Sequence, residues 1–175
     1  MTIRLYDVTV PVFLRGFGTL TALLEKGRAF AEAQGIGEAE MIGARLAPDM
    51  LTLAGQVQRA SDTAKFAAVR IGQVENVPFA DEEASFADLQ ARIARTRAFL
   101  EGVPRAAIDD REDAVISANI GRTPVTIAAR EYALRFALPN FYFHVTTAYG
   151  LLRHRGVPVG KMDYLGSLES DTTSG

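Results

Sequence analysis

The chain has 175 residues, of which 48% are hydrophobic and 23% charged, and this composition is that of one ordinary globular domain with a sizeable core. Its 19 basic and 21 acidic side chains give a net charge of -2, which argues against a nucleic-acid partner because such proteins carry a basic excess. Cysteine is absent, which excludes disulfides, thiolate metal sites and cysteine nucleophiles. With no secretory pattern and no long uncharged apolar run, the sequence predicts a soluble cytoplasmic protein without a membrane partner.

A first amphipathic helix is expected from Val10 to about Gln34, because apolar residues recur there at three- to four-residue steps. The segment Gly35-Ile36-Gly37 should end it, since glycine can take the left-handed conformation of a helix terminus. Gly16 and Gly18 lie inside the helical pattern, and we expect both to mark a close contact with another helix.

A second helix is expected to begin at Pro48, which suits a first helical turn, and to end near Gly72. Arg59, Asp62 and Lys65 lie within two turns of each other and are expected to form ion pairs on the solvated surface of this helix. The buried seam should be formed by Met50, Leu53, Val57, Ala60, Ala64, Ala68 and Ile71.

Residues 75–83 have no periodicity and contain a proline and an acidic cluster, so they are predicted to form a surface loop. Ser85 should cap a third helix, because its hydroxyl can accept from the free N–H groups of the first turn. Arg92, Arg95 and Arg97 are assigned to the solvated side of that helix, without a ligand.

The period changes to about two in residues 115–120 and 123–127, which predicts a β-hairpin around Gly121-Arg122. A fourth helix should run from Ala128 to His154, bent or interrupted at Pro139. These elements predict a mainly all-α fold: one four-helix bundle over residues 1–166, with a small peripheral hairpin, followed by a frayed tail over residues 167–175.

His144 falls on an apolar stripe of the fourth helix and is expected to point into the bundle. It is either a core histidine bonded to a neighbouring polar group or a metal ligand together with Asp49 and Asn140. Asp49 is either a ligand of that metal or an acid that complements the helix dipole from the first helical turn. His154 lies at the end of the fourth helix and is expected on the surface.

Three segments carry a resemblance to a known family: Leu46–Met50, Gln56–Gln58 with Asp62, and above all RFALPNFYFH at Arg135–His144. Over about residues 3–166 the chain resembles an uncharacterised domain-of-unknown-function family of the DinB/YfiT-like superfamily of helical bundles. The resemblance implies a four-helix bundle that is commonly dimeric, and it supplies no established activity.

The wider superfamily places one metal-binding histidine on the second helix and an HxxxH pair on the last long helix, followed by an arginine and a glycine. With Arg153 and Gly156 as that ending, the second histidine of the pair falls on His144 and the first on Asn140. The resemblance places the histidine of the second helix near Asp49. This sequence therefore keeps one of the three histidines.

Two functional hypotheses follow. The first is a bundle without a resident cofactor, forming a homodimer, with a degenerate metal-site pocket and a small-molecule ligand or a structural role. The alternative is a divalent-metal-dependent transferase, isomerase or hydrolase, with zinc or nickel held by Asp49, Asn140 and His144. The homodimer is expected because the aromatic-rich start of the fourth helix offers more apolar surface than one bundle needs.

Overall fold

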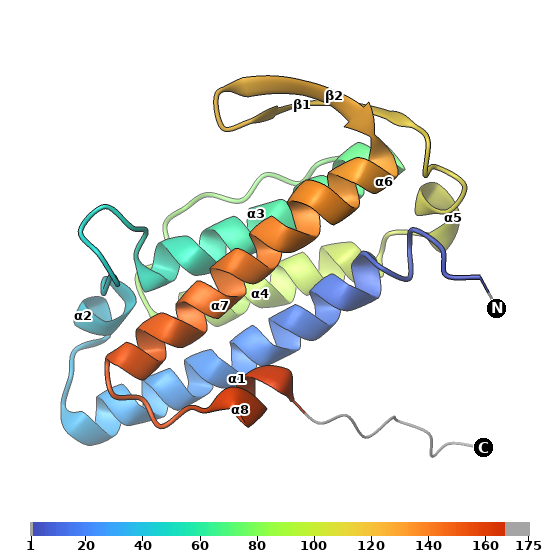
Figure 1. Ribbon diagram of the computed structural model, residues 1–175. Helices are drawn as coiled ribbons and strands as arrows, with labels where there is room; N and C mark the ends of the chain where they lie inside the picture. Colours follow the sequence, from blue (N-terminus) through green and yellow to red (C-terminus); the bar gives the residue numbers. More distant parts are fainter. Residues whose placement is uncertain (1, 167–175) are drawn as a thin grey trace, which may run out of the picture.

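Four long helices form a closed bundle in the computed structural model, which describes residues 2–166 (Figure 1). Helix α3 packs against α7 and α4, and α1 packs against α4 and α7, so each long helix has two long neighbours. Their bounds are Val10–Gln34 for α1, Leu53–Gly72 for α3, Phe86–Glu101 for α4 and Leu138–His154 for α7. The predicted mainly all-α bundle is confirmed.

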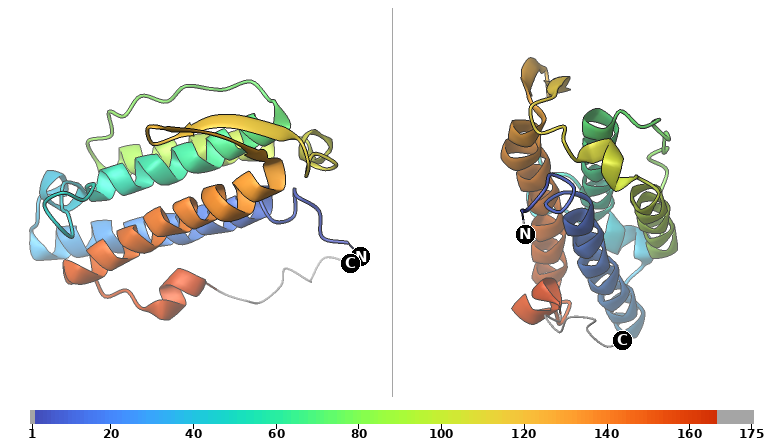
Figure 2. Two further views of the ribbon diagram at one scale, coloured as in Figure 1. Left: turned by 45° about the horizontal axis from the view of Figure 1, so that its top comes forward. Right: turned by 90° about the vertical axis from the view of Figure 1, so that its right-hand side faces the viewer.

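Helices α3 and α4 run in the same direction, opposite to α1 and α7 (Figures 1 and 2). This topology requires the connection between α3 and α4, residues 73–85, to return along the whole bundle. We call this segment the strap. The C-terminal end of α3 lies beside α5 (Arg105–Ile108), where Gly72 faces Ala107 and Ile108.

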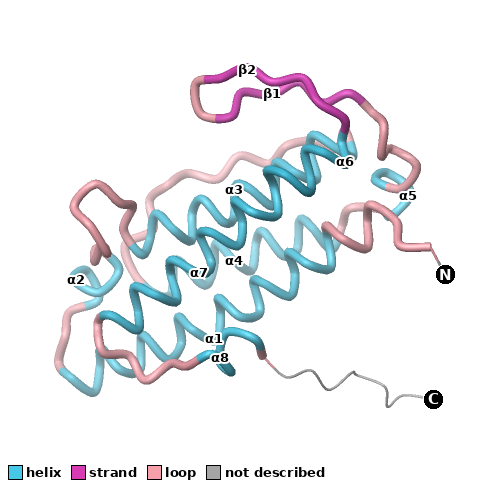
Figure 3. Tube along the Cα trace, in the orientation of Figure 1, coloured by secondary structure: helices cyan, strands magenta, loops and turns pink. Residues whose placement is uncertain are grey.

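A two-stranded antiparallel hairpin lies at the end of the bundle where α7 begins its run (Figure 3). Strand β1 (Val115–Ile120) pairs with β2 (Thr123–Ala128), and Gly121 takes the left-handed φ of 62° that the tight turn needs. The hairpin is attached through β2 to the short helix α6 (Ala129–Tyr132). Two further short helices complete the fold: α2 (Glu38–Ile42) and α8 (Lys161–Leu165).

The first helix is as predicted, ending at Gly35 with a left-handed φ of 65°. Gly16 permits the expected close contact, because a Cβ there would overlap the ring of Phe141. The same expectation for Gly18 was wrong, since no atom of another helix within residues 2–166 lies within 4 Å of the position that a Cβ would take there. The ring of Phe141, which lies against Gly16, also packs edge-to-face against Phe13 and Phe17. Its centroid is 5.0 Å from that of Phe13 and 5.1 Å from that of Phe17.

The predicted start of the second bundle helix at Pro48 was wrong. Helix α3 begins at Leu53, because Thr52 is its N-cap and accepts from the backbone N–H of Gly55 at 3.0 Å. Pro48 and Asp49 lie in a turn before it. A proline that suits a first helical turn also suits a turn, and the local sequence does not separate the two.

The predicted interruption of the last helix has a specific form. Between α6 and α7 the chain makes a π-helical segment, η1 (Ala133–Ala137), without leaving the helical path. Pro139 has no N–H to donate to the carbonyl of Arg135, so the regular hydrogen-bond ladder must change just before it. The wider π turn accommodates that change.

In residues 2–166, no helix combines the length and apolarity that crossing a membrane requires. The tail predicted over residues 167–175 lies outside the described residues.

Candidate functional site

Helix α3 carries polar side chains on two faces, one toward α7 and the other toward α4 and the strap. Gln56 and Thr63 bond to side chains of α7, whereas Ser61 bonds to α4 and Lys65 to the strap. The two faces use their polar groups differently, and the α7 face contains the residues that the sequence singled out.

His144 of α7 points into the bundle, as predicted, with only 8% of its surface exposed. Its Nδ1 lies 2.8 Å from Oε1 of Gln56, whose amide nitrogen donates to the carbonyl of Leu51 at 3.2 Å. Because this Gln56 oxygen can only accept, Nδ1 carries the hydrogen and Nε2 keeps a lone pair. Nε2 has no hydrogen-bond partner within residues 2–166.

Burial, together with the positive charge of Arg59, lowers the pKa of His144 to about 4. The imidazole is therefore neutral at pH 7. The fold thus holds one oriented, unprotonated ring nitrogen at the α3–α7 contact.

Asn140 lies one turn before His144 and forms a second link across the same helix pair. Its Nδ2 donates to Oγ1 of Thr63 at 2.7 Å, and the Thr63 hydroxyl donates to the carbonyl of Arg59 at 2.7 Å. The Oδ1 of Asn140 accepts no hydrogen bond from the part of the chain that the structure describes.

Asp49 stands apart from these two residues. It is exposed in the turn before α3, and its carboxylate makes no hydrogen bond or ion pair among the described residues. The residue of the second bundle helix that contacts His144 is Gln56. The expected position of Asp49 in a first helical turn was wrong because α3 starts four residues later.

The side chains present do not fit a tightly held zinc or nickel ion. Across residues 2–166, no group of three or more histidine, aspartate or glutamate side chains is arranged to hold a metal. The amide of Gln56 is bonded to Nδ1 of His144 and the amide of Asn140 to Thr63, and amide oxygens are poor ligands for these ions.

A cavity of about 350 Å³ opens next to Asn140, between α3, the start of the last helix and the hairpin. Three aromatic rings and two arginines contribute to its wall, so it combines apolar surface with positive charge. It is lined by Arg59, Asp62, Thr63, Phe66, Arg70, Asn119, Gly121, Tyr132, Phe136 and Asn140. We call it the hairpin cavity.

Arg70 is half-buried in the wall of the hairpin cavity and is held from two sides. Its Nη1 donates to the hydroxyl of Tyr132 at 2.6 Å. Its guanidinium carbon lies 5.1 Å from the ring centre of Phe66 and 5.6 Å from that of Tyr132. Burial raises the pKa of Tyr132 despite the opposing charge of Arg70, so the phenol stays neutral.

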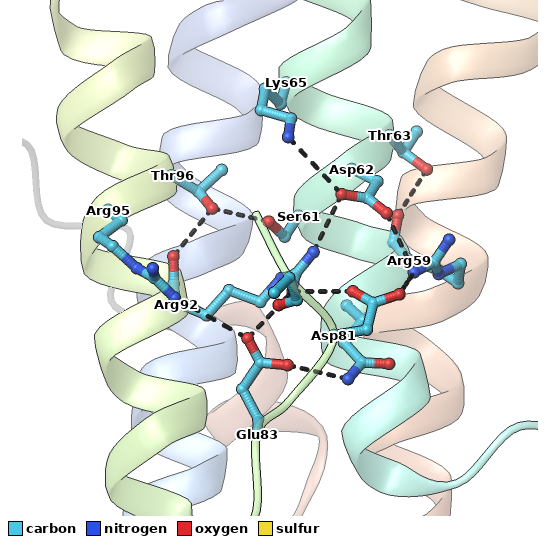
Figure 4. A network of polar contacts seen from close by, with 12 residues as sticks. Arg59, Ser61, Asp62, Thr63, Lys65, Asp81, Glu83, Arg92, Arg95 and Thr96 are labelled. Atoms are coloured by element: carbon cyan, nitrogen blue, oxygen red, sulfur yellow. Dashed lines mark hydrogen bonds and ion pairs between the residues drawn. The ribbon is translucent and has the colours of Figure 1, made fainter. Parts of the chain in front are cut away.

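The opposite face of α3 is closed by the strap and by a fully buried arginine of α4 (Figure 4). Arg92 is 0% exposed and pairs with Asp62 at 3.0 Å, Asp81 at 2.9 Å and Glu83 at 3.0 Å. Burial alone would raise the pKa of Glu83, but hydrogen bonds from Gln58 and Arg92 lower it. Glu83 therefore stays charged beside the guanidinium.

Two predictions about charged residues fail on this face. Arg92 was assigned to the solvated side of its helix with Arg95 and Arg97, yet Arg92 is buried, while Arg95 is exposed and Arg97 is half-buried. Lys65 was expected on the surface, yet it is 2% exposed and donates to the carbonyl of Val77 at 2.8 Å. In both cases the strap covers a side chain that the helix alone would leave in water.

Sequence reasoning missed the arginines and aromatic residues of the hairpin cavity. Phe66 and Arg70 are spaced i, i+4, which places them on one face of α3, and this spacing was available in the sequence. Tyr132 carried no such signal, because its meeting with Arg70 depends on the packing of α3 against the last helix.

The bundle and its polar α3–α7 contact define a DinB-like helical protein. A crystal structure of a DinB family member protein from Shewanella denitrificans superimposes with a TM-score of 0.85 and 40% sequence identity, covering 95% of this chain and 94% of that one. The family model described as a domain of unknown function, DUF1993, matches residues 5–165. The chain belongs to this family, as the sequence resemblance indicated. The comparison with curated proteins found no match.

Proposed function

We propose that this protein binds a small organic molecule between α3, α7 and the hairpin, without a resident metal ion. The hairpin cavity has the size of a small-molecule site, and its lining mixes aromatic rings with a few polar groups. His144 and Gln56 lie one turn beyond the lining residues Asn140 and Arg59, on the same two helices.

The observation that carries the proposal is the set of unused polar groups on this side of α3. Nε2 of His144, Oδ1 of Asn140 and most N–H groups of Arg70 find no hydrogen-bond partner within residues 2–166. These atoms keep some exposure to solvent, since Nε of Arg92 is the one buried side-chain nitrogen or oxygen without a partner in the described part of the chain, and a molecule from solvent can therefore reach them. A bound molecule would complete these hydrogen bonds.

The test uses the absence of tryptophan from this chain. In Phe136→Trp, the only indole lies in the wall of the hairpin cavity; in the matched control Met162→Trp, it lies on an exposed position of α8 outside that cavity. Compounds from a library of small acids, amides and alcohols should change the emission of the first variant alone. If no compound does so, or if both variants respond alike, the proposal is wrong.

The alternative is a divalent-metal-dependent transferase, isomerase or hydrolase using Asp49, Asn140 and His144. The free Nε2 of His144 favours it, because a neutral imidazole held through its other nitrogen is the usual form of a metal-binding histidine. Metal analysis of the purified protein, with melting curves in zinc or nickel, tests it. A stoichiometric ion whose stabilising effect is lost in His144→Ala would favour the enzyme.

We also propose that the protein forms a homodimer through the outer side of the last helix. Leu134 of η1 is 54% exposed and Phe143 of α7 is 56% exposed, and large apolar side chains of this kind are enriched at subunit contacts. Sedimentation velocity should show a dimer for the wild type and a monomer for Phe143→Ser. A wild-type species of only 19.0 kDa at micromolar concentration would contradict the dimer.

A further inference from the structure

Arg70 differs from the other buried or half-buried arginines of α3 and α4. Arg59 pairs with Asp62 at 3.0 Å and with Asp81, and Arg92 pairs with three carboxylates. Arg70 forms no ion pair with any carboxylate among residues 2–166, and its Nη1 donates a hydrogen bond to the neutral phenol of Tyr132. A guanidinium removed from much of its water is stabilised by an anion, and here the chain supplies none.

The position of Arg70 is fixed before any ligand arrives. The Tyr132 hydroxyl accepts from Nη1, and the rings of Phe66 and Tyr132 lie against the guanidinium plane at 5.1 and 5.6 Å. Only one of its nitrogens is used, so a further pair of N–H groups is available for the two-pronged contact that guanidinium makes with carboxylate. The Tyr132 hydrogen also has no acceptor in the described part of the chain.

The charge around the hairpin cavity favours an anion. Two arginines and one aspartate line it, and the carboxylate of that aspartate, Asp62, is already paired with Arg59 and Arg92. The uncompensated charge in the wall is therefore that of Arg70.

The remaining wall specifies the rest of the ligand. Phe66, Tyr132 and Phe136 all line the cavity, and the rings of Tyr132 and Phe136 lie 5.6 Å apart at 41°. A flat ring stacks favourably in such surroundings, and a volume of about 350 Å³ limits the ligand to a small molecule.

We propose that the ligand of the hairpin cavity is a small aromatic carboxylate whose carboxylate group binds Arg70 and the hydroxyl of Tyr132. This inference rests on the proposed function, because it names the class of molecule that the same site takes. It gives Arg70 the role of the specificity-determining residue.

The experiment compares three probes that differ in one property each: benzoate, the neutral benzamide and the non-aromatic acetate. Binding is followed by the emission of Phe136→Trp and, in the unmodified protein, by amide chemical shifts in nuclear magnetic resonance. We expect benzoate to bind at least about tenfold more tightly than the other two, since a hydrogen bond to a charged group is lost with benzamide and ring stacking with acetate.

Variants of Arg70 assign the effect to this side chain. Arg70→Met should weaken benzoate binding at least about tenfold, and Arg70→Lys should retain part of it, because lysine keeps the charge but not the two-pronged geometry. The control is Arg97→Met, a half-buried arginine of α4 outside the hairpin cavity, which should leave binding unchanged. Equal losses in Arg70→Met and Arg97→Met would overturn the assignment.

The outcomes separate this inference from the proposed function. If benzamide or other neutral library compounds bind as tightly as benzoate, the carboxylate class is wrong while the ligand site stands. If acetate binds as tightly as benzoate, the aromatic part is wrong. If no compound changes the emission of Phe136→Trp, both the class and the ligand site are wrong. The probe comparison needs no Arg70 variant, so it decides the question even if Arg70→Met does not fold.

Discussion

The two polar faces of α3 differ in how their buried and half-buried charged groups are partnered. Toward α4, the strap brings Asp81 and Glu83 onto Arg92, and the guanidinium meets a carboxylate on each side (Figure 4). Toward α7, Arg70 and His144 are held in place by neutral partners and keep unused hydrogen-bonding capacity. The charge of Arg92 is balanced by three carboxylates, although its Nε has no hydrogen-bond partner among the described residues, whereas Arg70 has no carboxylate partner there and can take one from a ligand.

The largest effect is expected from removing the centre of the ion-paired network around Arg92. Arg92→Met should lower the free energy of unfolding by about 3–5 kcal/mol, because it leaves buried carboxylates without their counter-charge. Urea denaturation measures it. The matched control Arg95→Met, on an exposed position of the same helix, should cost less than about 0.5 kcal/mol. Similar costs for both would show that the two faces of α3 do not differ as described.

The second effect is a pH dependence that comes from His144. Its pKa is about 4 in the folded protein and about 6.5 when unfolded, so the unfolded chain binds more protons between these values. The stabilisation is complete above pH 6.5 and falls as the pH drops toward 4, by up to roughly 3 kcal/mol. His144→Gln should remove this part of the wild-type pH profile, whereas His154→Gln, at an exposed histidine, should not.

The third effect sharpens the contrast between the two arginines. Arg70→Met should change the free energy of unfolding by less than about 1 kcal/mol, because it leaves no carboxylate unpaired and Tyr132 stays a neutral phenol. The same urea experiment measures it. A cost as large as that of Arg92→Met would make Arg70 a structural residue and remove the distinction.

The smallest effect is expected at Asp49. Because its side chain is exposed and unpaired within residues 2–166, Asp49→Ala should change stability by less than about 0.5 kcal/mol. Its melting curves in zinc and nickel should match those of the wild type. A loss of metal-dependent stabilisation in this variant would instead support the predicted metal site and the alternative enzyme.

The sequence by itself determined those elements whose signals are local. Gly35 ends α1, and Ser85 caps α4 because its hydroxyl accepts from the backbone N–H of Asp88. A left-handed residue or a capping side chain acts within a few residues of its own position. The hairpin around Gly121 follows for the same reason. The inward direction of His144 followed from helical periodicity, which also acts along one element.

Only the tertiary structure decided which polar groups are buried and with what partners. Arg92 and Lys65 lie on positions that an isolated helix would expose, and the strap covers them from a distant part of the chain. Gln56 rather than Asp49 meets His144, because the register between α3 and α7 is set by packing across the bundle. Arg70 and Tyr132 are 62 positions apart, and no local pattern reports whether such a pair meets or whether a carboxylate joins it.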